Sequence, residues 1–114
     1  MKITRDNARH FRWLDGRAEG WVFLEASDLH VLYEILQPGD AEKRHCHATT
    51  RQLYFVVGGE GSVDVEGVLS VVGAGESIAI PPGTRHKLTN AAREPLEFLV
   101  ISSNAPRSDR EDLE

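Results

Sequence analysis

Hydrophobic side chains in this chain occur in short runs separated by residues that favour turns. Nine runs predict β-strands at Trp21–Leu24, Leu29–Gln37, Arg44–His47, Gln52–Val57, Ser62–Val65, Leu69–Val72, Ser77–Ile80, His86–Thr89 and Leu96–Ser102. Most are separated by the turn-forming pairs Pro38-Gly39, Gly58-Gly59, Glu66-Gly67, Ala74-Gly75 and Pro82-Gly83. Asp6 predicts one short N-terminal turn of helix, and no other segment has a helical pattern. Strand-sized runs at about ten-residue spacing predict an all-β fold, either a sandwich or a barrel.

The chain divides into three parts by composition. Residues 20–103 carry the predicted strands and fit a single barrel, since 114 residues are enough for one domain with one core. Residues 1–19 are mostly polar and charged, and we expect this extension to pack on the barrel or on a dimer partner. In residues 104–114, six of eleven side chains are charged, so we expect a tail that is loose or folds onto another surface.

The composition is that of an ordinary globular protein, with 40% hydrophobic and 27% charged residues. A net charge of -5 argues against a nucleic-acid partner. The longest apolar runs, such as Phe98–Ile101, fall far short of the roughly 20 residues that span a membrane. The N-terminus lacks the apolar segment of a signal peptide, and the single cysteine, Cys46, excludes an intramolecular disulfide. We therefore expect a cytoplasmic protein with neither a nucleic-acid nor a membrane partner.

Two of the five histidines have the spacing of metal ligands. His45 and His47 lie two residues apart on a predicted strand, so both imidazoles point to the same face. The alternative is a pair of surface imidazoles beside basic neighbours. His10 and His30 match no motif, and we interpret both as structural or surface residues.

The histidine pair belongs to a longer pattern. The chain reads Gly39-x5-His45-x-His47-x4-Gln52-x6-Gly59 and, after fifteen further residues, Gly75-x5-Pro81-x-Gly83-x2-His86-x3-Asn90. These segments resemble the two motifs of the cupin superfamily, G-x5-H-x-H-x3,4-E-x6-G and G-x5-P-x-G-x2-H-x3-N, at every specified position but one. The motifs and their gap cover residues 39–90, about half of the chain. The segment from Ile101 to Leu113 is also similar to a group of compact single-domain bacterial cupins.

The resemblance implies a double-stranded β-helix, or jelly-roll, barrel of short antiparallel strands. It also implies that His45, His47 and His86 converge on one divalent transition metal, which the ligand set leaves open among Fe, Mn, Ni, Zn and Cu. Small cupins commonly pair, so we expect a homodimer with a small-molecule ligand in the barrel. The corner Pro81-Pro82-Gly83 agrees with this arrangement, because it turns the chain just before the His86 strand.

Gln52 is the one departure, because the family pattern has glutamate as the fourth metal ligand. A neutral amide oxygen leaves the bound ion its full +2 charge, so we expect weaker metal binding but a stronger Lewis acid. Three interpretations stay open. Gln52 is a direct ligand, or it only hydrogen-bonds a bound water, or the site has lost its metal.

Strand alternation suggests further side chains for the site. It places Lys43 on the same face as the two strand histidines and Cys46 on the opposite face. Lys43 is therefore a candidate contact for an anionic substrate, or a solvated residue at a strand end. Tyr54 shares the face of Gln52 and is a candidate catalytic donor or acid, or an ordinary core residue.

We expect a metal-dependent enzyme, dioxygenase-like or isomerase-like, that acts on a small polar metabolite. The alternatives are a non-catalytic module that binds a small ligand and a structural dimer with an inactive site. The motifs place no second carboxylate, since Glu60 and Glu76 lie at turns and Glu34 lies on a strand of uncertain phase. A missing base favours metal-centred redox or Lewis-acid chemistry over proton transfer.

Overall fold

The computed structural model describes all 114 residues and contains eleven β-strands and no helix. The strands are β1 (Arg9–Trp13), β2 (Ala18–Glu25), β3 (His30–Leu36), β4 (His45–His47), β5 (Gln52–Gly58), β6 (Glu60–Val65), β7 (Val68–Gly73), β8 (Ser77–Ile80), β9 (His86–Thr89), β10 (Leu96–Ser102) and β11 (Arg110–Asp112). The nine predicted strands are confirmed as β2 to β10. Strands β1 and β11 were not predicted. No helix with the length and apolar character needed to cross a membrane is present.

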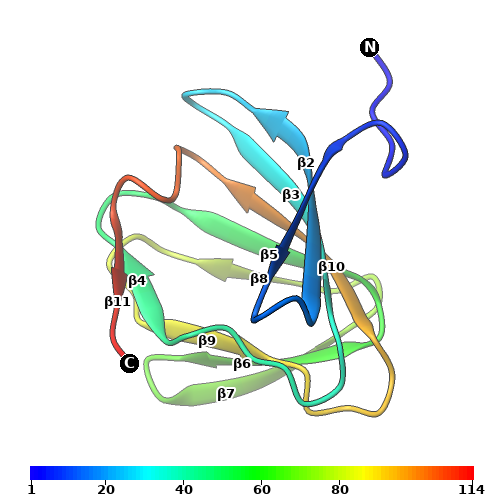
Figure 1. Cartoon of the computed structure of the whole chain (residues 1–114). Helices are drawn as coiled ribbons and strands as arrows, with labels where there is room; N and C mark the ends of the chain where they lie inside the picture. Colours follow the sequence, from blue (N-terminus) through cyan, green and yellow to red (C-terminus); the bar gives the residue numbers. More distant parts are fainter.

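The strands form two antiparallel sheets (Figure 1). One sheet has the order β1-β2-β3-β10-β5-β8, and the other has the order β11-β4-β9-β6-β7. Strands that are distant in sequence become neighbours, as where β10 lies between β3 and β5. Two facing sheets with such long connections form a jelly roll, so the predicted all-β jelly-roll fold is confirmed.

The core lies between the two sheets. Strands β5 and β10 alternate buried and partly exposed residues, as expected when one face of a strand packs inward. Their inward side chains join those of β6, β7 and β9 in one apolar cluster. In this cluster Tyr54 and Phe98 meet edge to face, with ring centroids 6.1 Å apart. The predicted inward direction of Tyr54 is therefore confirmed.

Two turns fix how the strands around the histidines meet. Gly59, between β5 and β6, has φ +83°, and a side chain there would collide with the backbone carbonyl of Pro95. Gly83 ends the corner before β9, and its N–H donates to the carbonyl of His47 at 2.6 Å. This bond ties the start of β9 to the end of β4, so the two histidine motifs meet in the folded chain.

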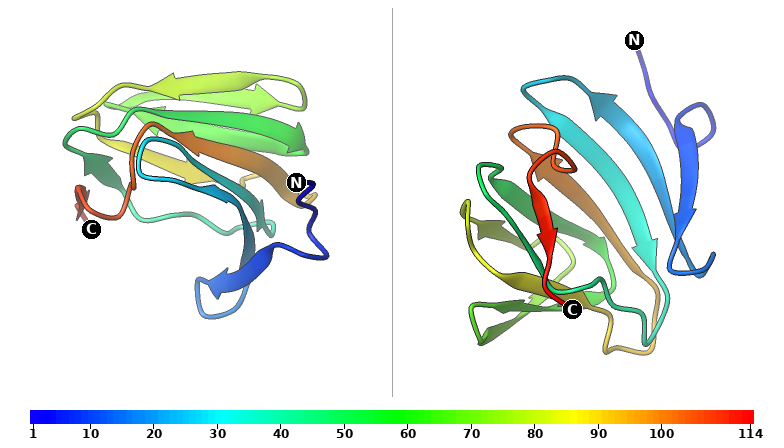
Figure 2. Two further views of the ribbon diagram at one scale, coloured as in Figure 1. Left: turned by 90° about the horizontal axis from the view of Figure 1, so that it is seen from above. Right: turned by 60° about the vertical axis from the view of Figure 1, so that its left-hand side comes forward.

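Both ends of the chain join the sheets (Figure 2). One hydrogen-bonded turn precedes β1, in which the Ala8 N–H donates to the carbonyl of Thr4 at 2.9 Å, but it starts at Thr4 rather than at Asp6 and does not continue into a helix. Strand β1 then pairs with β2 along its length. The charged tail is not loose, because β11 pairs with β4. Packing of the N-terminal extension on a dimer partner stays a prediction.

Candidate metal centre

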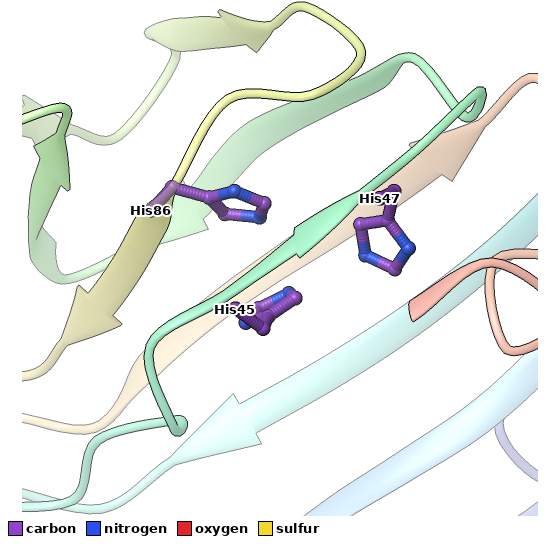
Figure 3. A group of neighbouring side chains, drawn as sticks. All are labelled: His45, His47 and His86. Atoms are coloured by element: carbon purple, nitrogen blue, oxygen red, sulfur yellow. The ribbon is translucent and has the colours of Figure 1, made fainter. Parts of the chain in front are cut away.

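Three buried imidazoles converge on one point between the sheets. His45 and His47 are separated by one residue on β4 and therefore point to the same side, and His86 is the register partner of His45 on β9. One ring nitrogen from each lies within 4.8 Å of the others (Figure 3). The predicted convergence of His45, His47 and His86 is thus present in the structure.

Each imidazole is held through its Nδ1 atom. Nδ1 of His45 lies 2.7 Å from the carbonyl oxygen of Lys43, and Nδ1 of His86 lies 2.9 Å from the carbonyl oxygen of Thr84. Nδ1 of His47 lies 3.2 Å from Oδ1 of Asp109. These acceptors select the tautomer with hydrogen on Nδ1, which leaves the lone pair of each Nε2 atom free to bind an ion.

The remaining polar atoms of the site lack partners within the protein. Nε2 of His47, Nε2 of His86 and Oε1 of Gln52 are all buried without a hydrogen bond. The Nε2 amide of Gln52 donates to Oγ of Ser102 at 3.0 Å, which orients its carbonyl oxygen away from that bond. Buried polar atoms normally have hydrogen-bond partners. These three atoms have free lone pairs instead, which fits the coordination of an ion.

The protonation states also suit a cation. Burial lowers the pKa of His45 to about 3, and it lowers the pKa of His86 as well. Both imidazoles are therefore neutral at neutral pH and do not have to lose a proton before binding an ion. Three neutral imidazoles and an amide oxygen form a donor set that fits a divalent transition metal.

A cavity of about 590 Å³ opens beside the histidines. Its wall is formed by Phe11, Arg12, Trp13, His30, Leu32, Glu34, Glu42, His45, His47, Gln52, Tyr54, Val100, Pro106, Arg107 and Arg110. The lining therefore combines three of the four candidate metal ligands, two carboxyl groups, three guanidinium groups and several apolar side chains. A cavity of this size holds a small molecule.

The sequence left the phase of the Glu34 strand uncertain and did not point to Glu42. Glu34 and Glu42 are only 8% and 9% exposed. Oε1 of Glu42 accepts from the hydroxyl of Tyr54 and from the N–H of Leu88, each at 3.0 Å, whereas Glu34 has no hydrogen-bond partner. Glu34 is the register partner of the buried Phe98, so it faces the interior. Its phase could have been found by counting back two residues from the apolar Leu36.

Both carboxyl groups hold a proton unusually tightly. Burial, reinforced by the neighbouring Glu42, raises the pKa of Glu34 to about 8. Burial also raises the pKa of Glu42 to about 7, although the hydrogen bonds from Tyr54 and Leu88 oppose the shift. The site therefore contains two carboxyl groups outside the motifs whose raised pKa values suit proton exchange near neutral pH.

Sequence predictions also concern three side chains outside the ligand set, namely Lys43, Tyr54 and His30. Of the two alternatives for Lys43, the structure agrees with a solvated residue near a strand end, because β4 begins only at His45 and Lys43 is exposed. Lys43 contributes only its backbone carbonyl to the site. Tyr54 belongs to the apolar core and also lines the cavity, and its catalytic role stays a prediction. His30, expected at a structural or surface position, also lines the cavity, and its buried Nδ1 has no partner.

The chain is similar to known proteins in sequence and in fold. A putative mannose-1-phosphate guanylyltransferase of Vibrio cholerae is 28% identical over 107 residues, which are 90% of this chain and 23% of that protein. An RmlC-like cupin from Shewanella frigidimarina has a TM-score of 0.82 at 22% identity, over 93% of this chain and 92% of that one. A sugar phosphate isomerase of the cupin superfamily from Silicibacter pomeroyi has a TM-score of 0.79 at 19% identity, over 93% and 77%.

The chain spans less than two-thirds of the length of the curated relatives that it matches. The cupin-domain family matches residues 32–102, which is more than half of the chain and includes both histidine motifs. The structural similarity covers nearly the whole chain and shows the same jelly-roll fold. On this sequence match and this fold, the chain belongs to the cupin domain family.

Proposed function

We propose that this cupin is a metal-dependent enzyme of the isomerase type, which moves a proton within a small, polar, sugar-like metabolite. One observation carries the proposal. A single cavity is lined by His45 and His47 of the three-histidine cluster, by Gln52, and by the buried carboxyl groups of Glu34 and Glu42. This arrangement favours proton transfer over dioxygenase-like chemistry, whereas the sequence alone favoured metal-centred redox or Lewis-acid chemistry.

The ligand set defines the first half of the site. His45, His47, His86 and the carbonyl oxygen of Gln52 would hold one divalent ion, which when bound supplies a Lewis acid that polarises a carbonyl or hydroxyl oxygen. Because all four ligands are neutral, no ligand charge reduces the +2 of the ion. The bond between Ser102 and the Gln52 amide fixes the direction of the carbonyl oxygen, which supports direct coordination by Gln52.

The carboxyl groups define the second half. Glu34 has no competing partner, and its pKa of about 8 allows it both to accept and to return a proton near neutral pH. It would remove hydrogen from a carbon next to a carbonyl group, while the electron pair of that C–H bond delocalises toward the carbonyl oxygen. Glu34 then returns a proton, which can exchange with solvent, to the former carbonyl carbon, while the hydroxyl proton on the first carbon moves to the former carbonyl oxygen, so the step needs no oxidant. Tyr54 keeps Glu42 in place beside it.

The substrate class is supported by the cavity and by the relatives. Arg12, Arg107 and Arg110 line the cavity and suit a phosphate or carboxylate on the substrate. The names of the Vibrio cholerae relative and the Silicibacter pomeroyi structure both refer to sugar phosphates. We therefore propose a small anionic sugar derivative, bound as one molecule in the barrel of each subunit of a cytoplasmic homodimer.

A non-catalytic ligand-binding module is the second candidate. Gln52 favours it, because a neutral residue at the family's glutamate position weakens the hold on a metal that catalysis would need. The structural dimer with an inactive site has less support, because its cavity should be filled by side chains, whereas this one is open and lined by polar groups.

Proton exchange with solvent distinguishes the candidates. Metal-loaded protein is incubated in D2O with a panel of aldose and ketose phosphates, and deuterium incorporation at carbon is followed by NMR. We expect exchange with one class of sugar phosphate, and at least a hundredfold slower exchange for Glu34→Gln with binding retained. Binding without exchange would support the ligand-binding module, and oxygen consumption would support dioxygenase chemistry.

A further inference from the structure

The C-terminal tail, residues 104–114, is attached to the strand that carries two of the candidate ligands. Strand β11 pairs with β4, with Arg110 opposite His47 and Asp112 opposite His45. The tail also supplies Pro106, Arg107 and Arg110 to the cavity wall. It lies outside residues 32–102, the part of the chain that the cupin domain family matches.

Asp109 makes the central contact between the tail and the site. Its Oδ2 atom accepts from the N–H groups of Thr49 and Thr50 at 2.8 and 2.7 Å and from the Thr49 hydroxyl at 3.0 Å. Its Oδ1 atom lies 3.2 Å from Nδ1 of His47. One carboxylate therefore joins the loop after β4 to the ring of a candidate ligand.

His47 differs from the other two histidines in the group that accepts the hydrogen bond from its Nδ1 atom. His45 and His86 each use a backbone carbonyl two residues away, which stays nearby wherever the tail lies. His47 depends on a side chain 62 residues later in the chain. If the tail leaves β4, the ring of His47 loses the acceptor that fixes its tautomer and orientation.

We propose that Asp109 is a positioning residue for His47, and that docking of the tail and binding of the metal stabilise each other. This inference rests on the proposed metal site. The docked tail holds His47 Nε2 toward the ion, and the bound ion in turn holds the tail on β4. Such coupling is reciprocal, so the factor by which docking tightens metal binding equals the factor by which metal tightens docking. Arg107 and Arg110 then reach their places in the cavity wall only when the tail is docked.

The first test compares metal affinities by calorimetric titration of the metal-free protein with Ni²⁺. We expect Asp109→Ala to bind Ni²⁺ 10- to 100-fold more weakly than the wild type, the usual effect of losing a hydrogen-bond partner of a ligand. Glu111→Ala is the matched control, because Glu111 is an exposed acidic residue on the same strand without a side-chain partner. It should bind Ni²⁺ as the wild type does.

The second test needs no substitution at Asp109, so it holds even if that variant folds poorly. Trypsin cleaves after Arg107, which is exposed in the tail. If docking and metal binding are coupled, saturating Ni²⁺ should slow this cleavage at least tenfold in the wild-type protein. His47→Ala should show no such protection, and this variant also controls for any effect of Ni²⁺ on trypsin.

The outcomes separate the two proposals. Ni²⁺ binding that is unchanged in Asp109→Ala, or tail cleavage that is insensitive to Ni²⁺ in the wild type, overturns the role of the tail and leaves the metal site standing. Wild-type protein that binds no Ni²⁺ overturns the proposed metal site together with the coupling that rests on it. Weakened binding in Asp109→Ala, with metal-dependent protection in the wild type, supports the coupling.

Discussion

His45 on β4 and His86 on β9 are register partners in one sheet, and their ring centroids lie 4.2 Å apart. Strand pairing brings these rings together although each belongs to a different motif. Desolvation opposes a positive charge on either ring, and burial lowers the pKa of both. The pair is therefore two neutral donors in a fixed arrangement, which is the basis of the predictions that follow.

Removing one imidazole should greatly weaken metal binding without unfolding the protein. We expect His47→Ala to lose at least a hundredfold in metal affinity, because one of three histidine ligands is missing. The fold should persist, because Asp109 stays anchored by the N–H groups of Thr49 and Thr50. Thermal unfolding with and without metal measures both effects, since an ion at 100 times its Kd stabilises the wild type by about 2.7 kcal/mol.

His10→Ala is the control for that experiment. His10 interacts with Glu19 and with the ring of Trp21, away from the cavity. Its removal should leave the metal-dependent stabilisation unchanged. Equal loss of stabilisation in both variants would mean that the ion binds nonspecifically to histidines.

Restoring the family's acidic residue should tighten the site. We expect Gln52→Glu to bind a divalent ion at least tenfold more tightly, because an anionic oxygen replaces a neutral one beside the cation. Gln52→Ala, which removes the oxygen, should bind more weakly than the wild type. Competition against a metal indicator dye measures both affinities. Equal affinities of the wild type, Gln52→Glu and Gln52→Ala for the ion would show that Gln52 does not coordinate it.

The Tyr54 hydroxyl should stabilise the folded state through Glu42. Tyr54→Phe removes one of two hydrogen bonds to a buried carboxyl group, so we expect a loss of about 1–3 kcal/mol in the free energy of unfolding. Tyr33→Phe is a matched control, because its hydroxyl donates to Glu97 at a more exposed position. It should cost less than 1 kcal/mol. Urea denaturation measures the difference, and equal costs would contradict the role of Tyr54.

The metal-free protein should lose stability as the pH rises. Because the folded-state pKa of Glu34 is raised from 4.5 to about 8, its contribution is fully present below pH 4.5 and is lost as the pH rises through 8. The contribution is up to about 5 kcal/mol. We expect Glu34→Gln to flatten this part of the stability curve, measured by urea denaturation in EDTA from pH 4.5 to 9.

Glu60→Gln is the control for the pH dependence, because Glu60 is exposed and outside the cavity. It should follow the wild-type curve. If Glu34→Gln also follows that curve, Glu34 titrates in the folded protein as it does in the unfolded chain. The proposed proton-transfer role would then lose its physical basis.

The sequence identified the strands whose pattern comes from apolar burial, and it missed those held in other ways. Strand β11 consists of Arg110, Glu111 and Asp112, which have no apolar side chain, so only its backbone pairing with β4 makes it a strand. Strand β1 has charged residues between its aromatic ones and was obscured by its polar composition.

The residues of the candidate site also divide into those that a sequence pattern marks and those that only the folded structure brings in. Motif spacing identified the three histidines and Gln52, because the family pattern specifies those positions. It could not identify Glu34 or Asp109, since neither belongs to a motif and each reaches the site through tertiary pairing. Alternation placed Lys43 on the inward face because it was extended to a residue that precedes the start of β4.

Metal content is the most direct test of the central claim. The protein is purified without an affinity tag or added metal, and the metals are quantified by mass spectrometry against protein concentration, with His47→Ala purified in parallel. We predict close to one equivalent of Fe, Mn, Ni, Zn or Cu in the wild type and less than a tenth of that in the variant. Wild-type protein that holds no metal, and takes up none when titrated with each of these ions, would contradict the account.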